Sequence, residues 1–419
     1  MKNKIVILLV LLPLMAEAEV KKPINFKNYI EQVREQNIAY AAQKLNIPIA
    51  DAKISAAKIF NDPTLSIEYA YNDDHRMQMG QGVSGELSKT FSPGKRTARI
   101  DLALSEKEMT AAVLDNYFHT LRSEATIAYL EAIKQGELYQ VKLNSYLSIS
   151  ELAKSDSVKW TLGKITETDA LQSRIEAGVI YNELLKAQSE LYNSYVALNV
   201  PLSSFNADTL YVPIGALQMA VRKFEINELL TQSLANRADL AAAFKNVTVA
   251  QKALKLARRE RNIDFDIALG YNYNTEVRNE LAPAPRFSGM TLGVSVPLKF
   301  SNFNRGTIRA ASLTATQAEY DYRQAQIEVQ TQVMKNHNLY LSLSTQVEHY
   351  TNGMLDKAKA VIDGKIYSYS RGESSLLEVL NAERTYNDLR AMYIQTLFDH
   401  AAGLVMLEGS VGIWDITIE

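Results

Sequence analysis

Two patterns of hydrophobic and polar positions divide the chain. Four short segments alternate apolar residues with small or polar ones, and they cover residues 64–71, 83–91, 265–273 and 290–298. Successive side chains of a β-strand point to opposite faces, so this alternation predicts strands whose two faces differ. The segments come as two pairs, which predicts two β-hairpins.

After each pair of strands, apolar residues recur at intervals of seven. The recurring positions are Leu104, Ala111, Phe118, Ala125, Ala132, Tyr139 and Tyr146 within 96–155, and Leu313, Tyr320, Ile327, Met334 and Leu341 within 305–367. Sustained heptads predict helices packed as a coiled coil. About 60 residues of helix span on the order of 90 Å, far more than a globular helix.

Each long helix ends at a glycine, and a second helix follows it. Gly163 precedes residues 166–198, and Gly372 precedes residues 374–407. A shorter helix is expected before each pair of strands, over 26–60 and 226–261. Each half of the chain is therefore predicted to contain a helix, a β-hairpin, a long helix and a further helix.

The two halves are related by an internal repeat. DPTLSIEYAYN at 62–72 and DFDIALGYNYN at 264–274 share an Asp, an alternating run and a final aromatic-X-aromatic-Asn, 202 positions apart. The expected organisation is a first structural repeat over 19–200, a linker over 201–223, a second repeat over 224–409 and an unrepeated tail over 410–419.

The first residues have the pattern of a secretory signal peptide. Lys2 and Lys4 precede an apolar run that ends at Met15, and Ala16-Glu17-Ala18 forms an A-x-A cleavage site. Residues 1–18 are therefore predicted to be removed on export. The alternative is a membrane anchor helix, which needs about 20 apolar residues.

Composition narrows the classes of function. The chain has 45 Lys and Arg, 47 Asp and Glu, a net charge of -2 and no Cys. This balance has no basic excess for nucleic acid, and the absence of Cys excludes disulfides and thiolate metal sites. The alternating strands suit a membrane wall with lipid on one side and water on the other, or an ordinary half-buried sheet. Four strands cannot close a barrel, so the membrane interpretation requires several chains to share one.

Three motifs together resemble those of a known family. They are Asn61-Asp62-Pro63-Thr64-Leu65 at the first strand, LSKTFSPGKRTAR at 87–99 and the two glycine turns. In this order, and with the repeat, the chain resembles the TolC-like outer membrane efflux family. Gly94-Lys95-Arg96 is the main indication of its heavy-metal (CzcC-like) branch.

This resemblance implies a mainly α fold with a small β part. Three chains would each give four strands to a twelve-stranded barrel in the outer membrane of a Gram-negative bacterium, and long helical hairpins would form a periplasmic α-barrel. The implied function is a passive exit duct, with metal cations as the expected cargo. Its partners would be a periplasmic adaptor, docked at the turns of Gly163 and Gly372, and an inner membrane pump of RND type.

The same resemblance leaves alternative functions open. The fold could serve multidrug efflux or type I protein secretion instead of metal export. A periplasmic coiled-coil scaffold or adaptor is a further alternative, although an adaptor normally has a single hairpin within a carrier-like domain. Outer membrane fractionation separates these two classes.

The resemblance also implies roles at the inner end of the tunnel. The implied entrance residues are Asp169, Tyr369, Arg371, Glu378 and Asn381. Tyr369 and Asp169 are expected to help tie the closed entrance, and Glu378 is expected to form a charged ring. Two positions depart from the family: Ser374 replaces an Arg, whose place Arg371 could reach, and Asn381 replaces the outer acid.

Other candidate sites have simpler explanations. His75, Met77 and Met79 have the side chains of a soft-metal site that would suit copper, or they merely alternate in a loop between strands. Single histidines without a metal-binding partner in the sequence are expected to pack or to lie on the surface, and they are His119, His337, His349 and His400.

Gly94-Lys95-Arg96-Thr97 superficially resembles a phosphate-binding loop. It lacks the earlier Gly and the Ser or Thr directly after Lys that such a loop requires. A basic turn where a strand leaves the bilayer is expected instead. No nucleophile, base and orienting residue occur as a set, so neither an enzyme nor a cofactor is expected.

Overall fold

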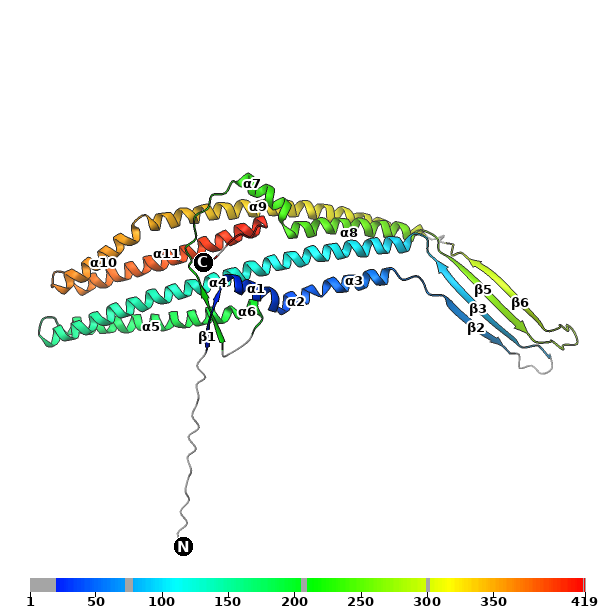
Figure 1. Cartoon of the computed structure of the whole chain (residues 1–419), viewed down its shortest axis with the longest axis horizontal. Helices are drawn as coiled ribbons and strands as arrows, with labels where there is room; N and C mark the ends of the chain where they lie inside the picture. The colour runs from blue at the N-terminus through cyan, green and yellow to red at the C-terminus, as the bar shows by residue number, and fades with distance from the viewer. Residues whose placement is uncertain (1–19, 72–77, 205–208, 299–301, 417, 419) are drawn as a thin grey trace, which may run out of the picture. The chain divides into compact units, whose positions relative to one another are not determined.

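A computed structural model describes residues 20–71, 78–204, 209–298, 302–416 and 418 (Figure 1). The expected signal peptide, 1–18, and His75 and Met77 lie outside the described residues. The chain is mainly helical with a small β part, as predicted, and divides into two compact units. Unit 1 comprises Met1–Ala41, Phe118–Ser233 and Gln332–Glu419, and unit 2 comprises Ala42–Tyr117 and Leu234–Thr331.

Unit 2 contains a four-stranded antiparallel sheet in the order β2-β3-β5-β6. The strands are β2 (Thr64–Ala70), β3 (Gly82–Phe91), β5 (Phe265–Asn274) and β6 (Phe287–Ser295). The two predicted hairpins are thus joined through β3 and β5 into one sheet. The fourth strand ends at Ser295 instead of the predicted 298, and Pro297, which has no N–H to donate, could not continue the ladder.

The register gives this sheet two different faces. Leu65, Leu87, Leu269 and Leu292 pair in one row across the four strands. The next row, on the opposite face, contains Ser66, Glu86, Gly270 and Thr291. All four leucines are at least half exposed, even on the central strands. Since a sheet face so rich in apolar residues is normally covered, another molecule or a lipid phase must cover this one.

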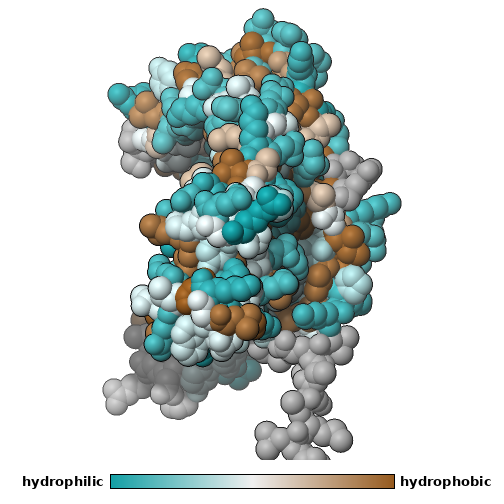
Figure 2. Space-filling model, turned by 90° about the vertical axis from the view of Figure 1, so that its left-hand side faces the viewer, coloured by the Kyte–Doolittle hydropathy of each residue, from teal (hydrophilic) through white to brown (hydrophobic). Residues whose placement is uncertain are grey.

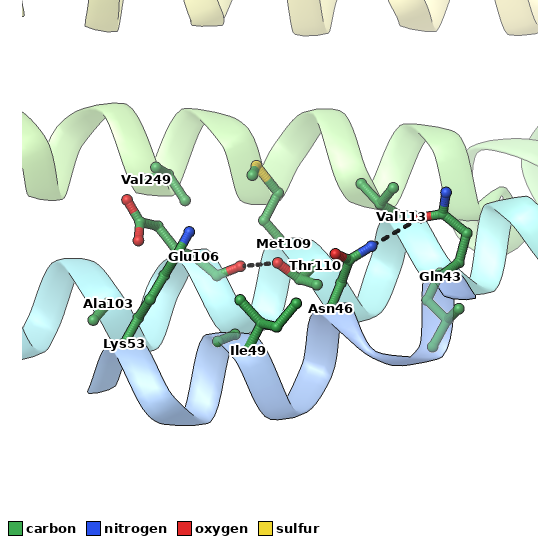
Figure 3. A pocket seen from close by; sticks show the side chains of 12 residues that line it. Gln43, Asn46, Ile49, Lys53, Ala103, Glu106, Met109, Thr110, Val113 and Val249 are labelled. Carbon is green, nitrogen blue, oxygen red and sulfur yellow. Dashed lines mark hydrogen bonds between the residues drawn. The ribbon is translucent and has the colours of Figure 1, made fainter. Parts of the chain in front are cut away.

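The helices of unit 2 include α3 (Asn46–Ala57) and α8 (Ala238–Glu260), with parts of α4 (Lys95–Thr161) and α9 (Arg305–Thr351). A 3-10 turn, Asn302–Asn304, precedes α9. Cross-helix ion pairs such as Lys255–Asp101, at 2.7 Å, tie α8 to α4. A pocket of about 370 Å³ lies among α3, α4 and α8, lined by Ile49, Met109 and Val249 (Figure 3).

Unit 1 contains the ends of both helical hairpins. It holds α1 (Phe26–Gln36), α5 (Glu167–Ala197), α6 (Asn199–Leu202), α7 (Ile226–Asn236), α10 (Met354–Ser370) and α11 (Leu376–Val411). A parallel pair of strands, β1 (Val20–Asn25) and β4 (Thr209–Ile214), was not predicted. The buried hydroxyl of Tyr129, on α4, accepts a hydrogen bond from the Ile214 N–H and lies 2.9 Å from the Ile24 oxygen, which fastens both strands.

Three helices predicted as continuous are broken. Residues 26–60 form α1, α2 (Ile38–Lys44) and α3, because Asn37 ends α1 and its Oδ1 caps the Tyr40 N–H at 2.7 Å. The helix over 226–261 breaks between α7 and α8 at Arg237, whose backbone is extended. The long helix over 305–367 breaks at Gly353, which has φ 84°. A positive φ favours glycine and ends the α-helical conformation.

The two predicted heptad patterns differ in burial. On α4, Ala125 and Ala132 are fully buried, as a packed coiled-coil position requires, whereas Leu104 and Ala111 nearer the start of the helix are exposed. On α9 all five heptad residues are 45–64% exposed, and they are Leu313, Tyr320, Ile327, Met334 and Leu341. The buried positions of α9 lie elsewhere, at residues such as Val333 and Tyr340. The apolar heptad residues of α9 are therefore left uncovered by the described residues of the chain. None of the described helices combines the length and apolar character needed to cross a membrane.

The C-terminal tail is clamped to unit 1 by a cluster of charges. Arg222 donates to both carboxylate oxygens of Asp415, at 2.9 and 2.7 Å, and to Glu408 Oε1 at 3.2 Å. The other oxygen of Glu408 accepts the Ile416 N–H at 3.2 Å. Burial, and secondly the neighbouring Asp415, raise the pKa of Glu408 to about 8. The Glu408 carboxyl is therefore protonated at neutral pH.

A glutamine in place of Glu408 should mimic this protonated carboxyl. The pKa of Glu408 is raised from the ordinary 4.5 to about 8 in the folded protein. The contribution of protonated Glu408 to stability is therefore complete below pH 4.5 and is lost as the pH rises through about 8. The wild type should therefore lose on the order of 2 kcal/mol more stability than Glu408→Gln between about pH 6 and pH 9. Thermal unfolding of the detergent-solubilised protein measures the difference, and parallel pH profiles would contradict the assignment.

Candidate functional site at the ends of the helical hairpins

Both helical hairpins end in the same local structure (Figure 1). Gly163 has φ 70° and Gly372 has φ 79°, left-handed conformations that side chains rarely adopt. The Lys164 N–H donates to the Lys159 oxygen at 2.8 Å, and the Glu373 N–H makes the equivalent bond at 2.9 Å. This pattern satisfies the last carbonyls of each helix. A Cβ on either glycine would meet no described atom within 4 Å, so both turns face open space.

The helix after each turn begins with a matching pair of side chains. Thr166 Oγ1 accepts the Asp169 N–H at 3.1 Å, and Ser375 Oγ accepts the Glu378 N–H at 3.3 Å. Asp169 and Glu378 each stand six residues after their glycine. Both acids therefore take the third helical position of a capping box, where negative charge also stabilises the helix N-terminus.

A buried polar contact joins the two hairpins. The Tyr369 hydroxyl, on α10, donates to Asp156 Oδ1, on α4, at 3.0 Å. Asp156 is fully buried, its other oxygen has no partner among the described residues, and Lys159 Nζ lies 3.4 Å from Oδ1. Lys159 also lies 4.3 Å from the centre of the Tyr369 ring. Burial, followed by the bond to Asp156, raises the pKa of Tyr369, which keeps the hydroxyl a donor at any physiological pH.

An apolar cluster surrounds this contact on all four helices. Its buried members are Ile149, Ile180, Ile362, Tyr369, Leu376, Val379 and Leu380. Water is therefore excluded from the Tyr369–Asp156 bond, which makes the bond stronger and its loss more costly. The end of the molecule that carries the turns is otherwise mostly hydrophilic, with apolar residues in separate groups (Figure 2).

The repeat explains why Asp156 needs a donor from the other hairpin. Asp156 and Lys365 both stand seven residues before their glycine. In the second hairpin, Lys365 forms an ion pair with Glu378. The first hairpin has acids at both equivalent positions, Asp156 and Asp169, and cannot form that pair. Instead, the Tyr369 hydroxyl donates a hydrogen bond to Asp156, and Lys159 provides the positive charge.

The remaining predicted entrance residues lie on the surface of the second turn. Hydrogen bonding to Lys365 lowers the pKa of Glu378, which stays ionised. Arg371 stacks over the Tyr367 ring at 4.7 Å. Asn381 is exposed on α11. The structure thus brings Glu378 to Lys365 and Tyr369 to Asp156, and each of these partners was missed from the sequence.

A second group of polar contacts joins the hairpins nearer the middle of the helices. Arg384 donates to Glu176 at 3.2 Å, and Asn387 donates to Ser145 Oγ at 2.8 Å. Asn387 also binds the buried Glu383 at 3.0 Å. These residues line a pocket of about 150 Å³. The two hairpins are therefore joined by hydrogen bonds between polar side chains as well as by apolar packing.

Other candidate residues lie away from these turns. His400 is buried against Tyr340 with ring centres 5.0 Å apart, and its Nε2 lies 3.2 Å from Ser344 Oγ. Gly94 turns the chain from β3 into α4, and the next residue, Lys95, pairs with Asp264 at 2.6 Å. Met79 lies 4.0 Å from the Asn279 amide nitrogen.

Comparison with known proteins agrees with this architecture. Residues 229–412 match the family model described as outer membrane efflux protein. The chain is 22% identical to the cobalt-zinc-cadmium resistance protein CzcC of Cupriavidus metallidurans over 86% of this chain and 83% of that protein. It is 22% identical to the outer membrane protein TolC of Vibrio cholerae over 76% of this chain and 70% of that one.

A solved structure shows the same fold. The crystal structure of CusC, reported for its transmembrane channel formation, superposes with a TM-score of 0.76 at 16% identity and covers 93% of this chain and 92% of that one. The fold is therefore TolC-like. The chain is similar to the outer membrane efflux protein family over residues 229–412 and to CzcC over most of its length, and these similarities indicate a protein of the outer membrane.

Removing the Tyr369 hydroxyl should loosen the joined hairpin ends. Tyr369→Phe removes the hydroxyl that donates to the buried Asp156 carboxylate and leaves only Lys159 Nζ, at 3.4 Å, beside it, which should cost about 1.5–3 kcal/mol. Hydrogen exchange of peptides around both turns should accelerate tenfold or more. The matched control is Tyr367→Phe, because Tyr367 lies in the same turn but is exposed. Equal exchange in the two variants would contradict a tying role for Tyr369.

Proposed function

We propose that three copies of this chain form the outer membrane exit duct of an efflux system, which conducts metal cations passively. The observation that carries the proposal is the sheet with one apolar and one polar face and two open edges, β2 and β6. Three such sheets, joined edge to edge, give twelve strands, enough for a barrel with a wet interior. The apolar faces then meet lipid and the polar faces line the lumen.

The helices support the same assembly. The exposed α9 heptad supplies an apolar stripe for a neighbouring copy, since a coiled-coil position left open on one chain is completed by another. The Tyr369–Asp156 contact supports a closed resting entrance, which would open when the hairpin ends separate. The turns of Gly163 and Gly372, which face open space, would dock a periplasmic adaptor connected to an inner membrane pump of RND type.

The polar face of the sheet favours cations as cargo. It carries three acids, Glu68, Glu86 and Asp266, and no Lys or Arg among the described residues of the four strands. A lumen whose charged side chains are all acidic attracts cations and repels anions. The relative CzcC is named for resistance to cobalt, zinc and cadmium, which supports metal cations. The homologues are transport proteins, and we infer that this chain catalyses no reaction.

Ion selectivity of reconstituted trimers tests this proposal. Wild-type channels in a salt gradient should give a reversal potential on the cation side, and Glu68→Gln with Glu86→Gln should move it toward zero. The matched control is Glu31→Gln, which removes an exposed acid on α1, outside the strands. An anion-selective wild type, or an unchanged potential in the double variant, would contradict the lumen assignment.

The cargo itself is tested in cells. A deletion strain should become sensitive to zinc, cobalt or cadmium salts and keep its resistance to hydrophobic drugs. The opposite result would favour multidrug efflux with the same fold.

A further inference from the structure

The apolar face of the sheet ends in a single cation. Lys89 pairs with Ile267 and therefore lies on the apolar face. It is the only charged residue on that face among the described residues of the four strands. The next pair is Phe91 and Phe265, whose rings stack with centres 5.5 Å apart. α4 begins four residues after Phe91, so this end of the sheet is the one next to the helices.

Lys89 and a second cation, Arg96, lie beside one exposed aromatic ring, that of Phe60. Phe60 follows α3 and is 64% exposed. The Arg96 guanidinium lies 4.1 Å from the centre of the Phe60 ring, and Lys89 Nζ lies 5.9 Å from it. Arg96 is held by one bond, from Nε to the Lys58 oxygen at 2.7 Å. Its terminal nitrogens have no bond to another described residue.

The charges of Lys89 and Arg96 are not neutralised within the described chain. Among the described residues no carboxylate lies within ion-pair distance of either one. The neighbouring Lys95 differs, because Asp264 lies 2.6 Å away and the Lys95 side chain is largely buried. Lys95 is therefore a structural residue, whereas Lys89 and Arg96 present free positive charge at the edge of an apolar surface.

We propose that Lys89 and Arg96, on either side of Phe60, bind the phosphate of an anionic glycerophospholipid headgroup. The inference rests on the proposed contact between the apolar face and lipid. At the boundary of a bilayer, aromatic rings and long basic side chains place their apolar parts in the hydrocarbon and their charges among the headgroups. Ile59 and Phe60, both exposed, would contact the acyl chains next to the bound phosphate.

The charge pattern selects an anionic lipid over a zwitterionic one. A basic residue near a membrane surface contributes about 1 kcal/mol of attraction to anionic lipid, which is about fivefold in affinity. A free phosphate ion would gain from the two cations but not from the exposed apolar side chains. The proposed ligand is thus the lipid, and inorganic phosphate should compete weakly.

Native mass spectrometry of detergent-solubilised trimers with added phosphatidylglycerol or phosphatidylcholine tests the site. The wild type should retain phosphatidylglycerol preferentially, and Lys89→Gln with Arg96→Gln should reduce that preference about 25-fold. Lys89→Arg with Arg96→Lys keeps both charges and should keep the preference. The matched control is Lys186→Gln with Lys359→Gln, which removes two exposed lysines of unit 1.

Three results would overturn the proposal. They are an unchanged preference in the Lys89→Gln and Arg96→Gln variant, an equal loss in the lysine control, and displacement of the lipid by millimolar inorganic phosphate. Bilayer conductance of the same samples separates this site from the function of the channel. Normal conductance of the Lys89→Gln and Arg96→Gln variant together with a lost lipid preference supports the site. A wild type that retains phosphatidylglycerol but does not conduct would contradict the proposed channel function and leave the lipid site supported.

Discussion

The backbone hydrogen bonds at the edges of the four-stranded sheet constrain this protein more than any other interaction. Strands β2 and β6 each have one edge without a partner among the described residues. In lipid every unpaired backbone group costs several kcal/mol, so an open sheet cannot remain there alone. An isolated sheet would be equally unfavourable in water, because the row of exposed leucines on one face would be hydrated. In the proposed assembly, association of several chains would satisfy both requirements and would provide a partner for the exposed α9 heptad.

The two structural repeats keep one backbone plan but differ in charge. Their turns share a left-handed glycine and a capping box, so the same local rules form both ends. Seven residues before the glycine, however, one repeat has Asp156 and the other Lys365. In the second hairpin Lys365 forms an ion pair with Glu378, whereas in the first Asp156 has Lys159 of its own helix at 3.4 Å and a hydrogen bond from Tyr369 of the other hairpin. A duplicated fold thereby acquires a contact between its halves, at the place where an entrance would have to open.

The sequence alone predicted the features that depend on local chemistry. The four strands follow from the alternating pattern, and the two turns follow from the glycines that end the long helices. Asp169 and Glu378 were expected as entrance residues, and their place in capping boxes was not predicted. The breaks at Asn37, Arg237 and Gly353 were missed. The apolar periodicity continues on both sides of each break, so it does not reveal a single residue with a non-helical backbone. Strands β1 and β4 were missed because they pair with each other across about 190 residues of sequence. Asp156 was missed because its partner comes from the other repeat, although superposing the turns would have aligned it with Lys365.

The central claim is that one face of the sheet meets lipid and the other meets water, and neighbouring positions on β5 test it directly. Ala268 lies on the polar face and Leu269 on the apolar face. The chain has no Cys, so Ala268→Cys and Leu269→Cys each introduce a single thiol. In intact outer membranes, a membrane-impermeant maleimide should label Ala268→Cys through the lumen and leave Leu269→Cys unlabelled. Equal labelling of both thiols, or labelling of Leu269→Cys alone, would contradict the account.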